Sequence, residues 1–446
     1  MNTRINNVWT QIRSSLWLIP AVLTASVIAL AFLTLFVDRY STVARVLQDQ
    51  WLFTIGPQGA RTLMATVAGS VIGIAGVSFS ITIVALTLAS SQFGPRLLNN
   101  FMKDMTNQMV LGIFIATFIY GLLVLGAIRE SEAHVFVPQI SIKVGIVLTF
   151  ISLGTFIYFI HHISASIHAE TIMTDVSHDL EKSIMQLFPE KVGHDHARTK
   201  SSATPSLPQN FEQHARSIVA PSSGYLQAID HQEMLALATE HDLLIYVQHR
   251  PGEFIVTHET LARIWPPHHK EDALLRKIAH TFLIGSQRTD EQDVEFALHQ
   301  LVEIALRALS PGINDPFTAI GCIDRLGGCL SLLSDRTLPS GYRYDETNTL
   351  RVVAHPITMD GIFDAAFNQI CQDGGACVAV GLRLLETFGV LASRTNTPTM
   401  QAPIRRHAQM VKDEMSRRIQ EEADLQEVEK RYEEIQKRLS LPEHRS

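Results

Sequence analysis

The chain has 446 residues, which is too long for one ordinary domain of roughly 100 to 200 residues. Its composition is 46% hydrophobic and 18% charged, and its mean hydropathy of +0.13 favours a membrane protein. The net charge of -7 provides no basic excess of the kind that nucleic-acid binding requires, so nucleic acid is not an expected partner.

Four apolar stretches in the N-terminal third are long enough to cross a bilayer as helices. A helix needs about 20 apolar residues to span a hydrocarbon core of about 30 Å. The predicted spans are residues 16–37, 62–90, 108–128 and 140–160. The first span has no small-residue cleavage site before Asp38, so we expect it to be retained as an anchor. We therefore predict an α-helical transmembrane domain over residues 1–165, with the lipid bilayer as a partner.

An even number of spans places both ends of the chain on the same side of the membrane. The basic residues on the two faces are nearly equal in number, so they do not fix the orientation. Basic residues precede the first span, however, and all four cysteines lie in the later part of the chain. We predict that these are free buried thiols suited to a reducing compartment, and that both termini are cytoplasmic. The cysteines are Cys322, Cys329, Cys371 and Cys377.

The second span contains two overlaid patterns of small and polar residues. A series of glycines favours close helix packing in a membrane. A series of hydroxyl side chains on the same helix is compatible with the wall of a pore. Hydroxyls in a helix can also bond to their own backbone, so packing alone is the alternative interpretation. The packing candidates are Gly69, Gly73 and Gly76, and the pore-lining candidates are Ser78, Thr82 and Ser91.

The segment after the second span resembles an interfacial helix. Gly94 and Pro95 interrupt the span, and apolar residues then alternate with Arg96 and Lys103, which predicts an amphipathic helix with these two residues at the interface. Small-conductance mechanosensitive channels have a similar layout, which is an analogy of arrangement alone. Apart from Lys143, whose side chain can extend to the interface, no span contains a fully embedded acid or base, which argues against the carboxylate relay of a proton-coupled transporter.

The character of the chain changes after residue 165. Residues 166–216 predict a helix followed by a polar linker. Residues 217–268 alternate apolar and polar residues between Gly and Pro turns, which predicts a small β-module. This module weakly resembles the barrel-sandwich modules of biotinyl and lipoyl carriers. It has no central lysine at a hairpin tip, so a carrier role is not expected.

Residues 269–395 predict a helical soluble domain. Thr289 and Gln292 have the spacing of a capping box that opens a helix ending near residue 309. In the SPGINDP segment that follows, Asp315 is placed to cap the next helix and Pro316 to occupy its first turn. A strand at 349–355 and helices at 359–372 and 375–389 complete the predicted elements.

The same SPGINDP segment has a second interpretation. Its polar side chains cluster beside a helix N-terminus, which favours anions. Ser310, Asn314 and Asp315 therefore form a candidate ligand loop, although capping already accounts for Asp315.

Residues 396–446 predict a charged, coiled-coil-like tail. Apolar residues recur there at spacings of three and four over about two heptads. Two heptads are marginal alone, so this seam requires neighbouring helices, and we expect a homo-oligomer. The seam consists of Leu425, Val428, Tyr432, Ile435 and Leu439.

Two segments, SFSITIVALTLASSQFGPRLLNNF and RALSPGINDPFTA, resemble a bacterial family of predicted inner-membrane proteins catalogued as a domain of unknown function. The resemblance extends from the first span into the helical region. It implies a four-span membrane domain, a soluble C-terminal domain and a bacterial inner-membrane location. It implies no activity.

No enzyme motif is present: the chain has no P-loop, HExxH, GxSxG or Rossmann fingerprint. We therefore expect no catalytic residues, no cofactor and no metal site. The first functional hypothesis is an oligomeric ion channel or permeation protein whose pathway is lined by the second span. The alternative is a membrane-anchored sensor or scaffold whose spans only hold the soluble domain at the membrane.

Overall fold

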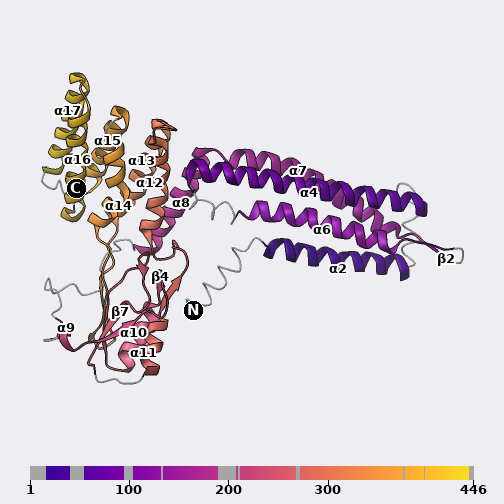
Figure 1. Cartoon of the computed structure of the whole chain (residues 1–446), viewed down its shortest axis with the longest axis horizontal. Helices are drawn as coiled ribbons and strands as arrows, with labels where there is room; N and C mark the ends of the chain where they lie inside the picture. Colours follow the sequence, from indigo (N-terminus) through magenta and orange to yellow (C-terminus); the bar gives the residue numbers. More distant parts are fainter. Residues whose placement is uncertain are drawn as a thin grey trace. The chain divides into compact units, whose positions relative to one another are not determined.

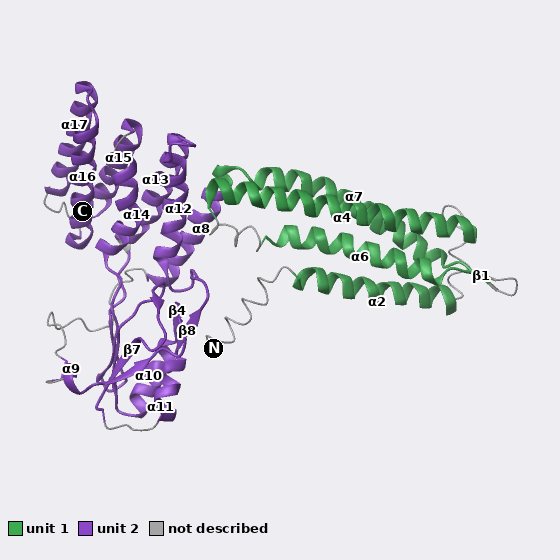
Figure 2. Ribbon diagram, viewed as in Figure 1, with its two compact units in different colours: residues 1–171 green, residues 172–446 purple. Residues whose placement is uncertain are grey.

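The structure is a computed structural model that divides into two compact units, residues 1–171 and 172–446 (Figure 2). Five of the described helices are long and apolar enough to cross a membrane, four of them in the first unit. These features confirm the expected fold class, an α-helical membrane protein with a soluble α+β region. The structure describes residues 17–40, 55–94, 104–131, 134–188, 207–208, 211–267, 272–374, 377–395 and 397–440.

The first unit contains four long helices that correspond to the four predicted spans (Figure 1). They are α2 (Leu18–Tyr40), α4 (Pro57–Phe93), α6 (Met105–Ala127) and α7 (Gln139–Ser166). Helix α6 packs against each of the other three, and its buried residues include Phe114, Tyr120 and Val124. A short hairpin, β1 (Arg129–Ser131) and β2 (His134–Phe136), joins α6 to α7.

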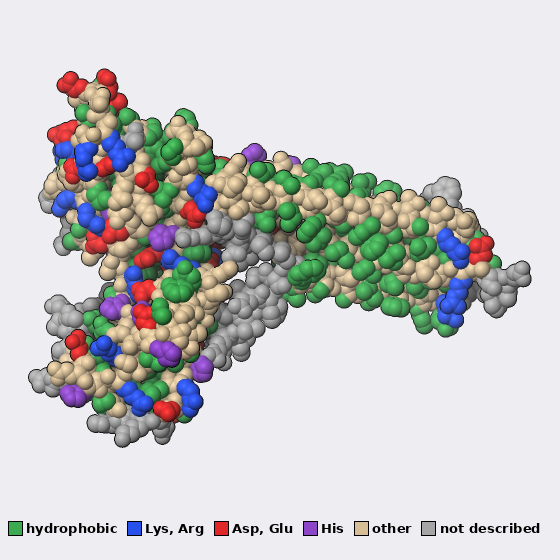
Figure 3. All heavy atoms as spheres, in the orientation of Figure 1, with side chains coloured by type: hydrophobic (Ala, Val, Ile, Leu, Met, Phe, Trp, Pro, Cys, Tyr) green, Lys and Arg blue, Asp and Glu red, His purple; other side chains and the backbone are tan. Residues whose placement is uncertain are grey.

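Hydrophobic side chains cover the length of this unit, and charged side chains gather at the end that carries the hairpin (Figure 3). Many large apolar side chains on these helices are exposed in the isolated chain, among them Phe32, Phe36 and Phe150. Such a surface suits a helix bundle that is surrounded by lipid rather than water. At 37 residues, α4 is about 55 Å long, so it extends beyond a hydrocarbon core of about 30 Å.

The second unit contains two sheets. The larger has the strand order β3-β7-β5-β10-β9, in which only β5 and β10 are parallel, and the smaller is antiparallel with the order β6-β4-β8. The strands are β3 (Arg216–Val219), β4 (Gly224–Ile229), β5 (Leu244–Val247), β6 (Phe254–Ile255), β7 (Thr260–Trp265), β8 (Phe282–Gly285), β9 (Tyr342–Tyr344) and β10 (Leu350–Val353). Since β8, β9 and β10 lie beyond residue 268, the sheets extend past the segment predicted as a β-module.

Short helices accompany the sheets and complete one hydrophobic core. Met234 of α10 (His231–Glu240) and Ile278 of α11 (Asp272–His280) are fully buried with Ile245 and Leu261 from the larger sheet. A further short helix, α9 (Phe211–His214), precedes β3. The alternating burial along β5 agrees with a strand that packs one face on this core.

Most of the remaining helices of the second unit stack in two layers. From α12 to α17, each helix packs against the next but one, and every consecutive pair except α13 and α14 also packs together. Helix α8, which follows α7 in the chain, contacts α13 through Met173 and Thr174. The helices are α8 (Ala169–Leu187), α12 (Val294–Leu309), α13 (Pro316–Ser331), the 3-10 turn η2 (Leu332–Asp335), α14 (Met359–Gly374), α15 (Val378–Arg394), α16 (Pro398–Arg418) and α17 (Glu422–Ser440). Helix α13 begins at the predicted Pro316, α14 and α15 correspond to the helices predicted at 359–372 and 375–389, and β10 corresponds to the strand predicted at 349–355.

Helix α13 with the first residues of η2 is the fifth candidate span by length and composition. Its buried residues include Ile323, Leu326 and Leu330, and it packs against α12 and α15 within the helical layers. This packing explains how so apolar a helix is accommodated outside the four N-terminal spans.

The capping box predicted at Thr289 and Gln292 is wrong. Helix α12 begins at Val294, and the carboxylate of Asp293 accepts the capping hydrogen bond from the backbone N–H of Phe296 at 3.1 Å. The side-chain amide of Gln292 instead forms two hydrogen bonds with the backbone of Ile229, at the end of β4. A contact between segments therefore overrides the local motif.

The seam of the C-terminal tail is covered within the chain. Val428, Ile435 and Leu439 of α17 are buried, and α17 packs against α15 and α16. The neighbouring helices that the seam requires are thus supplied by the same chain.

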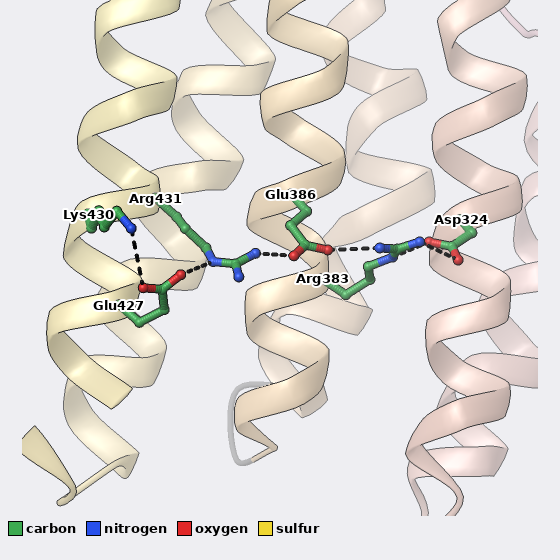
Figure 4. A network of polar contacts seen from close by, with 6 residues as sticks. All are labelled: Asp324, Arg383, Glu386, Glu427, Lys430 and Arg431. Atoms are coloured by element: carbon green, nitrogen blue, oxygen red, sulfur yellow. Dashed lines mark hydrogen bonds and ion pairs between the residues drawn. The ribbon is translucent and has the colours of Figure 1, made fainter. Parts of the chain in front are cut away.

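A chain of ion pairs also joins α13, α15 and α17 (Figure 4). Arg383 binds Asp324 through two hydrogen bonds of 2.5 and 2.8 Å and lies 2.8 Å from Glu386. Glu386 in turn pairs with Arg431, which contacts Glu427 at 2.8 Å. The charged outer faces of three helices are thereby connected through α15.

Candidate functional site

Two of the three pore-lining candidates, Ser78 and Thr82, lie four residues apart on one side of α4, and Ser91 lies on another face. The side chain of Ser78 is buried within the bundle, and its hydroxyl oxygen has no hydrogen-bond partner among the described residues. Thr82 donates to the carbonyl of Ser78 at 2.9 Å, and Ser91, which is exposed, donates to the carbonyl of Leu88 at 2.9 Å. The structure therefore does not bring all three hydroxyls together on one surface of a single chain.

The packing glycines of α4 face away from the other helices. Among the described residues, no atom lies within 4 Å of a Cβ built at Gly69, Gly73 or Gly76. Close helix approach occurs elsewhere, at Gly121, where a Cβ would lie 3.3 Å from Ala68, and at Gly112 against Pro20 and Leu23. The isolated chain thus leaves the glycine face of α4 open.

The interfacial candidates Arg96 and Lys103 lie outside the described residues. The candidate ligand loop is described, and most of its polar groups have partners within the loop. Asp315 accepts hydrogen bonds from the backbone and hydroxyl of Thr318, and Ser310 donates to the carbonyl of Arg307. The Thr318 hydroxyl bond is the main reason that the pKa of Asp315 lies below its ordinary value. The loop is accounted for by helix capping.

A polar cluster in the membrane unit was not predicted from the sequence. The carboxylate of Asp38 accepts hydrogen bonds from the N–H groups of Ile140 and Ser141, at 3.0 and 2.9 Å, and from the hydroxyl of Ser141 at 2.7 Å. The Tyr120 hydroxyl donates to the carbonyl of Ser141 and also contacts Thr34. Asp38 at the end of α2 thus satisfies free N–H groups at the beginning of α7, a favourable place for an anion.

The opposite end of α7 carries a second polar contact. His162 lies 2.6 Å from the carboxylate of Asp104, which also caps α6 through the N–H of Thr106. Helix α7 is therefore joined to α2 at its beginning through Asp38, and to the N-terminal cap of α6 near its end through Asp104.

The second unit contains a cavity of about 260 Å³. Its wall is built from six separate segments: the end of α8 (186–188), the end of β4 with the first residue of α10 (229–231), the turn after β5 (249–251), the start of α12 (292–295), residues 339–343 and residues 354–357. This volume lies just below the range of about 300 to 1,000 Å³ that is typical of small-molecule sites, so the cavity suits a small ligand. We take this cavity as the candidate functional site.

The two acids of the cavity wall each have an arginine partner. Asp293, which is 3% exposed, lies 2.6 Å from Arg288, and Glu295 lies 3.5 Å from Arg250. Burial raises the pKa of Asp293, and the charge of Arg288 opposes that shift. These pairs offset the acidic charge of the site.

A glycine lets the turn after β5 approach this ion pair. Gly252 has a φ of 96°, a left-handed conformation that favours glycine. A Cβ at this position would overlap the carboxylate of Asp293. The backbone N–H of Gly252 also donates to the carbonyl of Leu226 at 2.7 Å, which ties the turn to β4. His249, one of the lining residues in this turn, lies 2.8 Å from Glu253.

Two further basic residues of the wall are Arg343, in an edge strand of the larger sheet, and His231, at the beginning of α10. Arg343, in β9, donates through Nη1 to the carbonyls of Ser340 and Tyr342, and it has no carboxylate partner among the described residues. Burial lowers its pKa. The Nδ1 atom of His231 is buried without a hydrogen-bond partner in the described part of the chain. Burial, and then the charge of Arg343, lower the pKa of His231, so near pH 7 this side chain is neutral.

Sequence reasoning did not find this site, because its residues span positions 186 to 357 and form no motif. A helix-capping pattern in the sequence can account for Asp293, which caps α12, but it does not indicate the other residues of the cavity wall. Nothing local marks Arg343 as different from other strand arginines. Within the described residues, no group of three or more His, Cys, Asp or Glu side chains could hold a metal ion. All four cysteines are free thiols, three of them buried.

The chain is similar to proteins that share its membrane character. The family described as "Predicted membrane protein (DUF2254)" matches residues 13–389. The uncharacterized protein Rv1290c of Mycobacterium tuberculosis is 32% identical over 384 residues, which cover 84% of this chain and 72% of the relative. The uncharacterized protein Mb1321c of Mycobacterium bovis matches with the same identity and the same coverage. No solved structure is significantly similar to the chain.

Proposed function

The chain belongs to the DUF2254 family of predicted membrane proteins, and from that premise we propose that it is a membrane-anchored sensor that binds a small molecule in the cavity of its second unit. In this proposal the four spans hold the unit at a bacterial inner membrane, and the unit faces the cytoplasm. The function is the recognition of a solute, and no chemical conversion is part of it.

The observation that carries this proposal is the position of α8 in the chain. The last residues of α8 line the cavity, and its first residue, Ala169, follows the end of α7 after only Ile167 and His168. A molecule in the cavity therefore contacts the far end of a helix that is connected almost directly to a membrane span. If the ligand binds one arrangement of α8 more tightly than another, binding shifts the equilibrium between the two arrangements.

The site also has the composition of a small-molecule pocket. Apolar side chains such as Phe188 and Ile229 share the wall with a few convergent polar groups. The two acids of the wall are held by arginine partners, Asp293 by Arg288 and Glu295 by Arg250. Because these side chains are already ordered, less conformational entropy is lost when a ligand binds.

Binding can be tested on the full-length protein purified in detergent. The probes are millimolar phosphate, succinate, a nucleotide monophosphate, glutamate, glucose and choline, and the readout is the thermal unfolding midpoint. We expect at least one probe to raise the midpoint by several degrees, because ligand at 100 times its Kd adds about 2.7 kcal/mol. The matched variant Ser340→Trp, which enlarges an exposed residue of the cavity wall, should abolish the shift while unfolding at the same temperature without ligand. Failure of every probe to shift the wild type contradicts the proposal.

A permeation protein is the second candidate. It is favoured by Ser78, whose hydroxyl is buried in the bundle without a partner in the described chain, and by the open glycine face of α4, on which a second copy could pack. Ion flux through protein reconstituted in liposomes, with the oligomer mass determined in the same detergent, separates the two functions. The sensor proposal predicts no flux. Flux that is lost on Ser78→Leu or Thr82→Leu with intact folding would favour the channel, and the expected homo-oligomer would then form its pathway.

A further inference from the structure

One guanidinium of the cavity wall has no carboxylate partner among the described residues. Asp293 is matched by Arg288 and Glu295 by Arg250, so the guanidinium of Arg343 is left without a carboxylate among the described residues. Arg343 is half-buried and lies in the cavity wall. A guanidinium removed from water without a counter-charge is unfavourable, so an anionic ligand at this position would relieve that penalty.

The hydrogen bonds of Arg343 also leave a particular side of its guanidinium available. Both bonds to protein, to the carbonyls of Ser340 and Tyr342, come from Nη1. The Nε–H and Nη2–H groups, which point in parallel along the other side, have no partner in the described residues. These two donors form the fork that binds a carboxylate or phosphate through two parallel hydrogen bonds.

A second polar group of the wall is close enough to contribute. The charge of Arg343 acts on His231, and the Nδ1 atom of that histidine is buried without a partner among the described residues. A buried ring nitrogen without a hydrogen bond is rare in folded proteins and calls for a partner. His231 is the first residue of α10, whose N-terminus adds a favourable potential for negative charge.

We propose that the cavity binds an oxyanion, a carboxylate or phosphate group of a small molecule, which accepts two hydrogen bonds from the Nε and Nη2 atoms of Arg343 and one from Nδ1 of His231. This inference rests on the proposed sensor function and specifies the chemistry of its ligand. Arg343 is the anchor, and His231 is a polar neighbour that becomes a donor when its Nδ1 carries hydrogen. The apolar wall formed by Phe188 and Ile229 receives the rest of the molecule.

Isothermal titration of the full-length protein in detergent tests the assignment. The probes are inorganic phosphate and succinate, with glucose and choline as neutral and cationic comparisons. We expect the oxyanions to bind and Arg343→Gln to weaken them by about 10- to 100-fold, the usual effect of removing hydrogen bonds to a charged group. Arg343→Lys retains the charge and loses the fork, so it should weaken succinate more than phosphate. Arg276→Gln, on α11 and outside the cavity wall, is the matched control and should bind as the wild type does.

The outcomes separate this inference from the function on which it rests. Binding of glucose or choline without binding of either oxyanion overturns the oxyanion assignment and leaves the sensor proposal standing. Oxyanion binding that is unchanged in a folded Arg343→Gln variant also overturns it, because the anion then lies elsewhere. If no probe binds to the wild type, both proposals fail. Loss of oxyanion binding in Arg343→Gln, with the Arg276→Gln control unaffected, supports both.

Discussion

Single side chains decide where the helices of the second unit begin. Asp315 caps α13 as its position in SPGINDP predicted, and replacement by Ala should reduce the free energy of unfolding by about 1 kcal/mol. The thermal unfolding of the purified protein measures this change. Asp290→Ala removes an exposed acid with no such contact and is the control. An Asp315→Ala variant as stable as the control would show that the cap contributes nothing.

The lowered pKa of Asp315 gives that contribution a pH dependence. A carboxyl whose pKa is lower in the folded state stabilises the protein above its unfolded pKa of about 4 and loses this effect as the pH falls through the folded value. The difference between wild type and Asp315→Ala should therefore be constant near neutral pH and shrink in acid. The observation that the difference stays unchanged down to pH 2 would contradict the hydrogen bonds to Thr318.

His231 titrates in the opposite sense. Burial and the charge of Arg343 lower its pKa, with Asp230 opposing, so the folded protein favours the neutral ring. The pKa of this histidine in the unfolded chain is near 6.5. Its contribution to the free energy of unfolding is therefore complete above pH 6.5 and decreases as the pH falls toward the folded-state pKa. His231→Gln should reduce this loss between pH 7.5 and pH 5. Equal acid losses in both proteins would be inconsistent with a buried neutral histidine.

At the scale of elements, the ion-pair chain of Figure 4 joins three helices on a partly exposed face. Glu386 pairs with two arginines, and the hydrogen bond from Arg431 is the main cause that lowers its pKa. Its side chain is 41% exposed, so solvent screening limits its effect. Glu386→Gln should reduce stability by at most about 1 kcal/mol, and the reduction should largely disappear in 1 M salt. The control Glu346→Gln changes an exposed acid that has no ion pair among the described residues, so it should not alter stability at low or high salt. A salt-independent effect at Glu386 would indicate lost packing instead.

Elements with a strong local signal could be predicted, and those that depend on distant partners could not. The four spans follow from uninterrupted apolar runs, and Asp315 follows from its place before Pro316 at a helix start. The capping box at Thr289 failed because Gln292 bonds to a strand that lies 63 residues away in the chain. The apolar seam of α17 was recognised, but its partners α15 and α16 could not be deduced from periodicity.

The site shows the same limit at the scale of the whole unit. Arg343 becomes notable only when Asp293 and Glu295 are seen to have other partners, and no spacing in the chain reveals that. Asp38 is similar, since its bonds to Ile140 and Ser141 join residues about one hundred positions apart. The predicted Ser310–Asp315 loop drew attention because its motif is local, and the structure accounts for it by capping.

The central claim for the whole molecule is that a ligand in the cavity acts on the end of α8, which follows the fourth span in the chain. Hydrogen–deuterium exchange of the full-length protein in detergent tests this claim, with and without the probe that most raises the unfolding midpoint. We predict slower exchange at residues 184–188, 229–231 and 341–343, and no change in α16 or α17, which do not line the cavity. Protection of the strand residues without any change at the end of α8 would contradict the sensor account.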